Sequence, residues 1–118
     1  METNEVLNRK ELFARVDDDV ELLGELIELF MEDYPDLIAG IQSAIATQDA
    51  TALKKAAHTL KGAIGNFCAP KAFEATRKME MNGVTGDFST SQLDFQNLLQ
   101  EMENATAALK KLSEEFSD

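Results

Sequence analysis

The chain has 118 residues, the usual size of one folded domain, and we expect residues 1–118 to form a single domain. Its net charge of −11 argues against nucleic acid as a partner, because binding to a phosphate backbone depends on a basic surface. The chain has no run of about twenty apolar residues, and Met1–Glu5 lack the features of a secretory signal, so we predict a cytoplasmic protein with no membrane partner.

Asn8 with Glu11 resembles a capping box and predicts a short first helix that carries Leu12, Phe13 and Val16. Helices are the elements expected throughout, because Pro and Gly are few and β-branched residues do not alternate with polar ones. The first prediction along the chain is therefore a short helix with an apolar side.

A second capping pair, Asp18 with Glu21, opens a long helix. The apolar residues that follow recur at spacings of three and four, which places them in one stripe: Val20, Leu23, Ile27, Phe30, Tyr34, Ile38, Ile41 and Ile45. The phase of this stripe continues across Pro35. We therefore predict one helix over residues 18–47, bent at the proline, which removes a backbone hydrogen bond.

Two further helices follow at short intervals. Asp49 is a cap for a third helix that runs to about Phe67. Pro70 suits the first turn of a fourth helix, which we expect to end near Gly83. Residues 83–88 are then the one clear linker.

Ser89 with Gln92 gives another capping signal and predicts a long last helix. Its apolar stripe also has spacings of three and four: Leu98, Met102, Ala105, Leu109, Leu112 and Phe116. Long regular stripes and short connections predict an all-α protein, an antiparallel four-helix bundle with the short N-terminal helix as a cover over one end.

Basic residues gather in one part of this acidic chain. Residues 51–81 contain six basic and two acidic side chains and so carry +4, which leaves −15 for the rest of the chain. The basic residues of this island are Lys54, Lys55, Lys61, Lys71, Arg77 and Lys78. One interpretation is that these basic residues lie together by chance on a solvated helix face. The island also holds His58, the only histidine in the sequence.

His58 falls on the exposed side of its predicted helix. At about 100° per residue, the buried side is made of Leu53, Ala57, Leu60, Ile64 and Phe67. The residues three, four or seven positions from His58 share its face: Lys54, Lys55, Lys61, Gly62 and Gly65. Each glycine costs a helix about 1 kcal/mol relative to alanine. We interpret both as openings for another protein to approach His58, with close packing of a neighbouring helix as the alternative.

The residue types around His58 suit phosphoryl transfer. A neutral imidazole nitrogen is nucleophilic at neutral pH. Lys61, one turn away, would offset the charge of a bound phosphoryl group. The sequence has no Gly-rich nucleotide loop beside this helix, so we predict a phosphoryl carrier without kinase activity of its own.

The run AHTLKGAIGNFCA over residues 57–69 resembles the signature of the histidine phosphotransfer (HPt) domain family of multistep phosphorelays. The resemblance covers nearly the whole chain and implies a four-helix bundle with an exposed phosphorylated histidine. It implies that His58 is the phosphoacceptor, Lys61 the neighbouring cation, and Gly62 and Gly65 the small residues that open the approach. The implied partners are receiver domains, whose aspartate donates or accepts the phosphoryl group and whose bound magnesium assists.

Two positions depart from the family pattern. Cys68 stands where many members have glycine, and Glu80 stands where some members place a glutamine near the histidine. A carboxylate at residue 80 would orient the unphosphorylated ring but repel the phosphoryl group. Cys68 is the only cysteine, so an internal disulfide is excluded, and one histidine with one cysteine does not make a metal site. We predict no metal or other cofactor, and a small buried apolar role for Cys68.

Two other functions remain as alternatives. One is the phosphotransfer domain of a chemotaxis-type kinase, which normally belongs to a much longer chain. The other is a module that docks receivers without transferring phosphate, although proteins of that kind typically lack the histidine. We expect a monomer that docks receivers through an apolar patch surrounded by the basic island, with Phe13, Lys54 and Lys55 as candidate docking residues.

Overall fold

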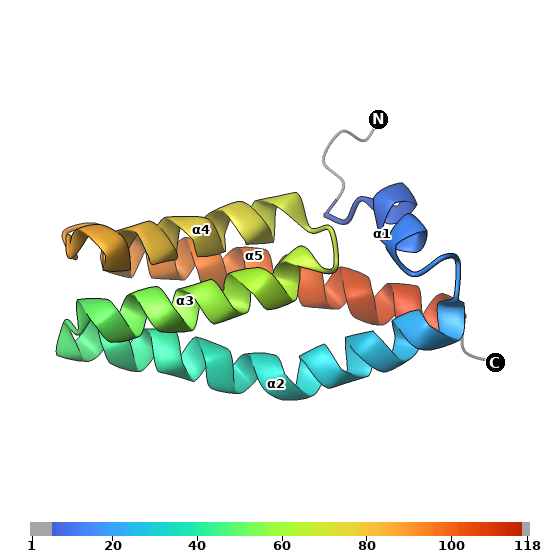
Figure 1. The fold of residues 1–118 in the computed structure, drawn as a ribbon, viewed down its shortest axis with the longest axis horizontal. Helices are drawn as coiled ribbons and strands as arrows, with labels where there is room; N and C mark the ends of the chain where they lie inside the picture. The colour runs from blue at the N-terminus through green and yellow to red at the C-terminus, as the bar shows by residue number, and fades with distance from the viewer. Residues whose placement is uncertain (1–5, 117–118) are drawn as a thin grey trace.

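The computed structural model describes residues 6–116, so Met1–Glu5, which carried the signal-sequence prediction, lie outside it. Within 6–116 the chain forms helices and no strands, and the all-α prediction is confirmed. The helices are α1 (Arg9–Arg15), α2 (Val20–Thr47), α3 (Ala50–Gly65), α4 (Pro70–Thr85) and α5 (Ser91–Glu115), as Figure 1 shows. None of the helices described has an apolar stretch long enough to cross a membrane.

The four long helices lie side by side along the long axis of the molecule (Figure 1). α3 packs against α2 on one side and α4 on the other, and α5 packs against both α2 and α4. α1 lies near one end of these helices (Figure 1). Its position is fixed by a hydrogen bond from the Asn8 N–H to the Cys68 carbonyl (2.8 Å) and by an ion pair between Arg9 and Glu115 (2.6 Å).

Several predicted helix starts are confirmed. The Asn8 side chain accepts a hydrogen bond from the Glu11 N–H at the start of α1. Asp49 accepts one from the Ala52 N–H at the start of α3. Pro70 is the first residue of α4, where its missing N–H removes no helical hydrogen bond.

The predicted caps of α2 and α5 are each one residue too early. Asp19, not Asp18, caps α2, because its side chain accepts the Leu22 N–H while Asp18 has a left-handed backbone with φ +60°. α5 begins after Thr90, whose hydroxyl donates to the Asp94 carboxylate. Ser89 belongs to the preceding turn.

The fourth helix is longer than predicted. α4 continues through Gly83 to Thr85 and ends at Gly86, which has a left-handed backbone with φ +72°. Glycine takes this conformation without steric strain, so Gly86 is the residue that terminates the helix. Gly83 is buried inside α4 and does not begin the linker.

The two long predicted stripes form most of the core on α2 and α5. On α2 the buried members are Leu23, Ile27, Phe30, Ile41 and Ile45, and on α5 they are Leu98, Met102, Ala105, Leu109 and Leu112. Val20 and Phe116, at the ends of the stripes, are exposed. α2 is one helix across Pro35, as predicted, and its ribbon curves along its length (Figure 1).

α3 and α4 approach closely where Gly83 meets the backbone of Lys54. A Cβ atom at Gly83 would lie 2.7 Å from the Lys54 Cα, nearer than real side chains come. About three turns further along α3, a Cβ at Gly65 would lie 3.3 Å from the Phe73 ring of α4. Glycine at both places allows the two helices to run close together over most of their length.

We predict that Gly83→Ala lowers the free energy of unfolding by about 2 kcal/mol, because the added methyl group must force the two backbones apart. Urea unfolding followed by circular dichroism measures this change. Gly24→Ala on α2 is the matched control: no atom lies within 4 Å of a Cβ there, and the same substitution should raise stability by about 0.5–1 kcal/mol. Equal gains at both sites would contradict the close approach.

Candidate functional site

His58 projects from the middle of α3 into solvent. Its side chain is 69% exposed. The five residues predicted for the opposite side of the helix are all buried: Leu53, Ala57, Leu60, Ile64 and Phe67. The helical periodicity therefore placed the imidazole correctly.

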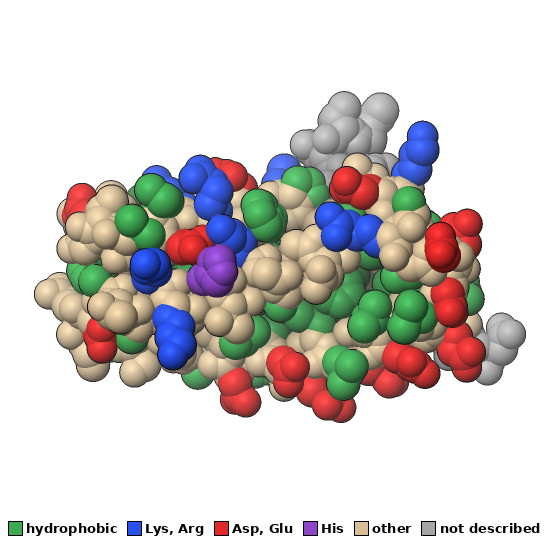
Figure 2. Space-filling model, viewed as in Figure 1, with side chains coloured by type: hydrophobic (Ala, Val, Ile, Leu, Met, Phe, Trp, Pro, Cys, Tyr) green, Lys and Arg blue, Asp and Glu red, His purple; other side chains and the backbone are tan. Residues whose placement is uncertain are grey.

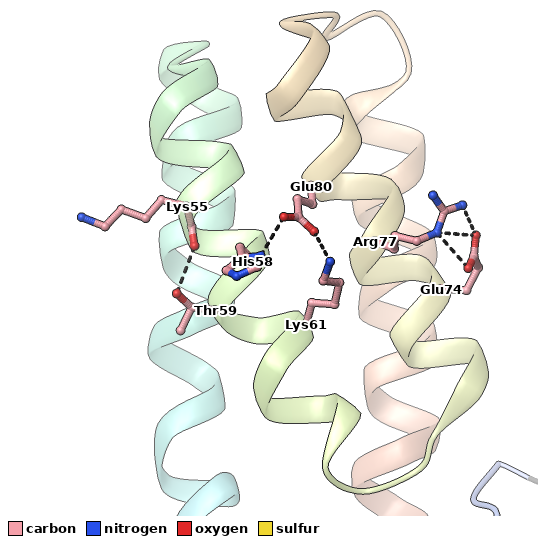
Figure 3. A network of polar contacts seen from close by, with 7 residues as sticks. All are labelled: Lys55, His58, Thr59, Lys61, Glu74, Arg77 and Glu80. Carbon is pink, nitrogen blue, oxygen red and sulfur yellow. Dashed lines mark hydrogen bonds and ion pairs between the residues drawn. The ribbon is translucent and has the colours of Figure 1, made fainter.

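One carboxylate from α4 contacts both polar groups of this face of α3. Glu80 Oε2 lies 2.8 Å from His58 Nδ1, and Glu80 Oε1 lies 2.6 Å from Lys61 Nζ. Figure 3 shows Glu80 reaching across from α4 between the two side chains. The Glu80 side chain is only 13% exposed, so these two contacts replace most of the water that would otherwise surround the carboxylate.

The packing of α3 on α4 explains why Glu80 lies here. Gly83 sits against Lys54, and Gly65 sits against Phe73. Between these two points, the antiparallel course of the helices brings the residue one turn before Gly83 opposite the residue one turn after Lys54. Those residues are Glu80 and His58.

The charge on Glu80 determines which imidazole nitrogen is available. The hydrogen bond from Lys61 lowers the pKa of Glu80 most, burial opposes that shift, and the hydrogen bond from His58 lowers it further. An ionised carboxylate only accepts hydrogen bonds, so His58 Nδ1 must carry the hydrogen. The lone pair of the neutral ring is then on Nε2, the nitrogen that Glu80 does not occupy.

The sequence matches the Hpt domain family over residues 25–111. This chain belongs to the Hpt domain family. Its fold is similar to the crystal structure of histidine-containing phosphotransfer protein B (HptB) from Pseudomonas aeruginosa PAO1, with a TM-score of 0.88 and 18% sequence identity over 97% of this chain and 99% of that one. A comparison with curated proteins found no significant match.

The family membership confirms the resemblance seen in the sequence. As an Hpt domain, the protein has a histidine phosphotransfer role in phosphorelay signalling. Hpt domains are phosphocarriers that interact with receiver domains. The exposed histidine in the middle of α3 suits this role, because a carrier must present its acceptor atom to another protein.

Lys61 of this Hpt domain is already paired. Its ammonium group contacts Glu80, and its side chain is largely buried. The sequence analysis predicts Lys61 as the cation that offsets the charge of a bound phosphoryl group, and it did not anticipate this pairing. Contact with that group therefore requires Lys61 to share or leave its bond with Glu80.

The two glycines beside His58 differ in their surroundings. No atom lies within 4 Å of a Cβ built at Gly62, which is exposed on the face of His58. The Phe73 ring packs beside Gly65. Gly62 therefore leaves open space near the histidine. Gly65 instead allows close packing of the neighbouring helix, which was the alternative interpretation of these glycines.

The predicted docking residues lie in different places on the Hpt domain. Lys54 and Lys55 are exposed on α3, one turn before His58, and Figure 2 shows basic side chains gathered around the histidine. Phe13 lies on α1, where its half-buried ring packs edge-on against Phe116, with ring centres 5.6 Å apart. The docking role of all three stays a prediction.

Three exposed leucines on α2 were missed by the sequence analysis. Leu22, Leu26 and Leu29 are 36–57% exposed. Their spacing of four and three residues makes a second apolar line on α2, one residue out of phase with the buried stripe. The search for apolar residues at spacings of three and four, which found the buried stripe, would have found this second line as well.

Within residues 6–116, no group of three or more acidic, histidine or cysteine side chains is placed to hold a metal ion. The absence of a cofactor on this chain stays a prediction. Cys68 is buried, in agreement with the predicted role. Burial raises the pKa of its thiol, which makes the thiolate scarce at neutral pH.

We predict that Glu80→Ala removes the preference for hydrogen on Nδ1. In the wild type, nitrogen NMR of the neutral ring should report one tautomer, with Nδ1 protonated, because Glu80 accepts from that nitrogen. The variant should report a mixture of tautomers. Asp87→Ala, on the loop after α4, is a control that removes a carboxylate without touching the ring. An unchanged spectrum in Glu80→Ala would contradict the role given to Glu80.

A second prediction concerns stability and pH. Because the pKa of Glu80 is lower in the folded protein than in the unfolded chain, its charge stabilises the fold above the ordinary carboxyl pKa of about 4.3. That contribution is lost as the pH falls through the lowered pKa. Glu80→Gln should therefore be less stable than the wild type by about 1–2 kcal/mol at pH 7, and the difference should shrink in acid. Urea unfolding at several pH values measures it, and a difference that grows in acid would contradict the assignment.

Proposed function

We propose that this protein carries a phosphoryl group on Nε2 of His58, between the aspartates of receiver domains in a phosphorelay. One observation carries the proposal: the hydrogen bond from Nδ1 to Glu80 leaves Nε2 as the nucleophilic atom of a 69% exposed ring.

The transfer step needs little from the protein besides position and charge. The Nε2 lone pair attacks phosphorus in the aspartyl phosphate of a receiver. The N–P bond forms as the P–O bond to the aspartate breaks, and the carboxylate leaves with the electron pair. The hydrogen stays on Nδ1, so the ring gains positive charge, which the Glu80 carboxylate stabilises. The reverse step passes the group to another aspartate.

Other groups needed for phosphorylation belong to the partner proteins in this proposal. We expect it to have no kinase activity of its own and to bind no cofactor, with magnesium held by the receiver. Once a phosphoryl group is on Nε2, Lys61 is a cation one turn away on the histidine's own helix. Lys61 then divides its contacts between Glu80 and the phosphoryl oxygens.

We also propose the finer architecture: a single domain and a monomer, in which α2 to α5 form an antiparallel four-helix bundle with α1 as a cover. Support comes from the packing, because each of the four long helices contacts two others of the four. Such a bundle holds α3 rigidly from both sides, which fixes the histidine in place.

We predict that a phosphorylated receiver domain transfers its phosphoryl group to the wild type and not to His58→Gln. The product should be labile in acid and stable in base, as expected for phosphohistidine. Radiolabel transfer followed by gel electrophoresis measures it, with circular dichroism to check that the variant is folded.

Lys110→Gln is the matched control, since it alters an exposed residue of α5, which packs against α2 and α4, and leaves the imidazole and the α3 lysines intact. It should still accept the label. A wild type that accepts no label from several receivers would overturn the carrier function and favour a docking module. Equal labelling of His58→Gln would move the acceptor to another residue.

A further inference from the structure

A groove of about 390 Å³ lies between α2 and α3 on the face that carries His58. Its apolar wall is formed by five residues: Leu26, Phe30, Leu37, Ala63 and Phe67. Phe30 and Phe67 form its buried floor, with ring centres 5.2 Å apart, and Leu26 is exposed at its edge. The groove is therefore a fixed apolar surface open to solvent.

The groove adjoins the phosphoryl site. Thr59, the residue after His58, lines it, and Ala63 and Asn66 continue the same side of α3 at spacings of four and three. Gly62 lies on the helix face between the histidine and this wall and has no side chain to block the way. A protein that reaches Nε2 across Gly62 therefore comes next to the groove.

The two sides of this face carry opposite charges. α2 contains six acidic residues and no Lys or Arg, whereas α3 contains three lysines and no acidic residue. Asp33 and Asp36 are exposed at the α2 side of the groove. Figure 2 shows this division: basic side chains surround the histidine, acidic ones follow the edge formed by α2, and apolar ones lie between.

We propose that Asp33 and Asp36 are specificity residues that select receiver domains with a Lys or Arg beside the apolar side chain that fills the groove. The occupant of the groove is thus the contact face of a receiver, with its acidic phosphorylation site toward the α3 lysines and a basic group toward α2. This inference rests on the proposed function and names the partner surface that fits it.

Charge complementarity is the physical reason. Carboxylates at the edge of an apolar contact lose water when a partner docks, so a partner that offers no cation leaves them unpaired, and one that offers an anion is repelled. Opposite charges on the two sides also set one orientation, because a receiver turned end for end would meet like charges on both. Specificity then comes from rejecting wrong receivers as much as from binding the right one.

The test compares second-order rate constants for phosphoryl transfer to the wild type and to its variants. One phosphorylated receiver is used throughout, the one that transfers fastest to the wild type. Asp33→Lys/Asp36→Lys should lower the rate constant at least about tenfold at low salt, because the partner's cation now faces lysines. At saturating receiver concentration the transfer rate itself should be unchanged, since His58 and Glu80 are intact.

Glu103→Lys/Glu114→Lys is the matched control. Both residues are exposed on α5, which packs against α2 and α4, and the double substitution changes the net charge by the same amount. Its effect on the rate constant should stay within about twofold. A receiver whose contact-face Lys or Arg is changed to Glu should recover transfer to the Asp33→Lys/Asp36→Lys protein and lose it to the wild type.

The outcomes separate this inference from the proposed function. Equal effects of the two double substitutions, or no recovery with the charge-reversed receiver, would overturn the selectivity of Asp33 and Asp36 while transfer to His58 stands. Failure of the wild type to accept phosphate from any receiver would overturn the carrier function itself. Asp33→Asn/Asp36→Asn, which only removes charge, should show a smaller loss of several-fold, and it decides the question if the lysine variant does not fold.

Discussion

At Gly83 the backbone of α4 lies so close to α3 that a methyl group would stand 2.7 Å from the Lys54 Cα. This contact sets the register of the two helices, and the rest of the site depends on it. One turn along from Gly83, the register brings Glu80 to His58. A side chain at Gly83 would separate the helices at that point and withdraw the carboxylate from the ring. The contact between Glu80 and His58 thus depends on the absence of a side chain at Gly83, one turn away from Glu80.

Glu80 divides its two oxygens between His58 and Lys61, and this sharing gives the site its resting charge. The Lys61 ammonium and the Glu80 carboxylate neutralise each other, so this pair adds almost no net charge beside the ring. In the proposed transfer, a phosphoryl group on Nε2 changes that balance, because the group adds negative charge close to Glu80 while the ring becomes positive. The carboxylate therefore both supports the charged ring and repels the oxygens bound to it. Because these two effects oppose each other, the phosphoryl group is easily transferred onward, as a carrier requires.

Helical periodicity alone predicted the long stripes of the core and the exposure of His58, because both depend on one helix at a time. The helix starts were less predictable, since the left-handed backbone of Asp18 moves the cap of α2 to Asp19. Gly83 was interpreted as a linker residue because a glycine near a helix end looks the same whether it terminates the helix or packs against another. The ion pair of Glu80 with Lys61 depends on that same packing, which no local pattern specifies.

Cys68 follows α3 with φ +55°, a backbone conformation that favours glycine, the residue that the family resemblance led us to expect at this place. Its carbonyl holds the Asn8 N–H at the start of α1, and its thiol is buried. A thiol reagent can reach the sulfur only in molecules where this region has opened. Since the chain has no other cysteine, the protein contains its own single-site reporter, and the rate of thiol modification measures how often the region between α1 and the end of α3 opens.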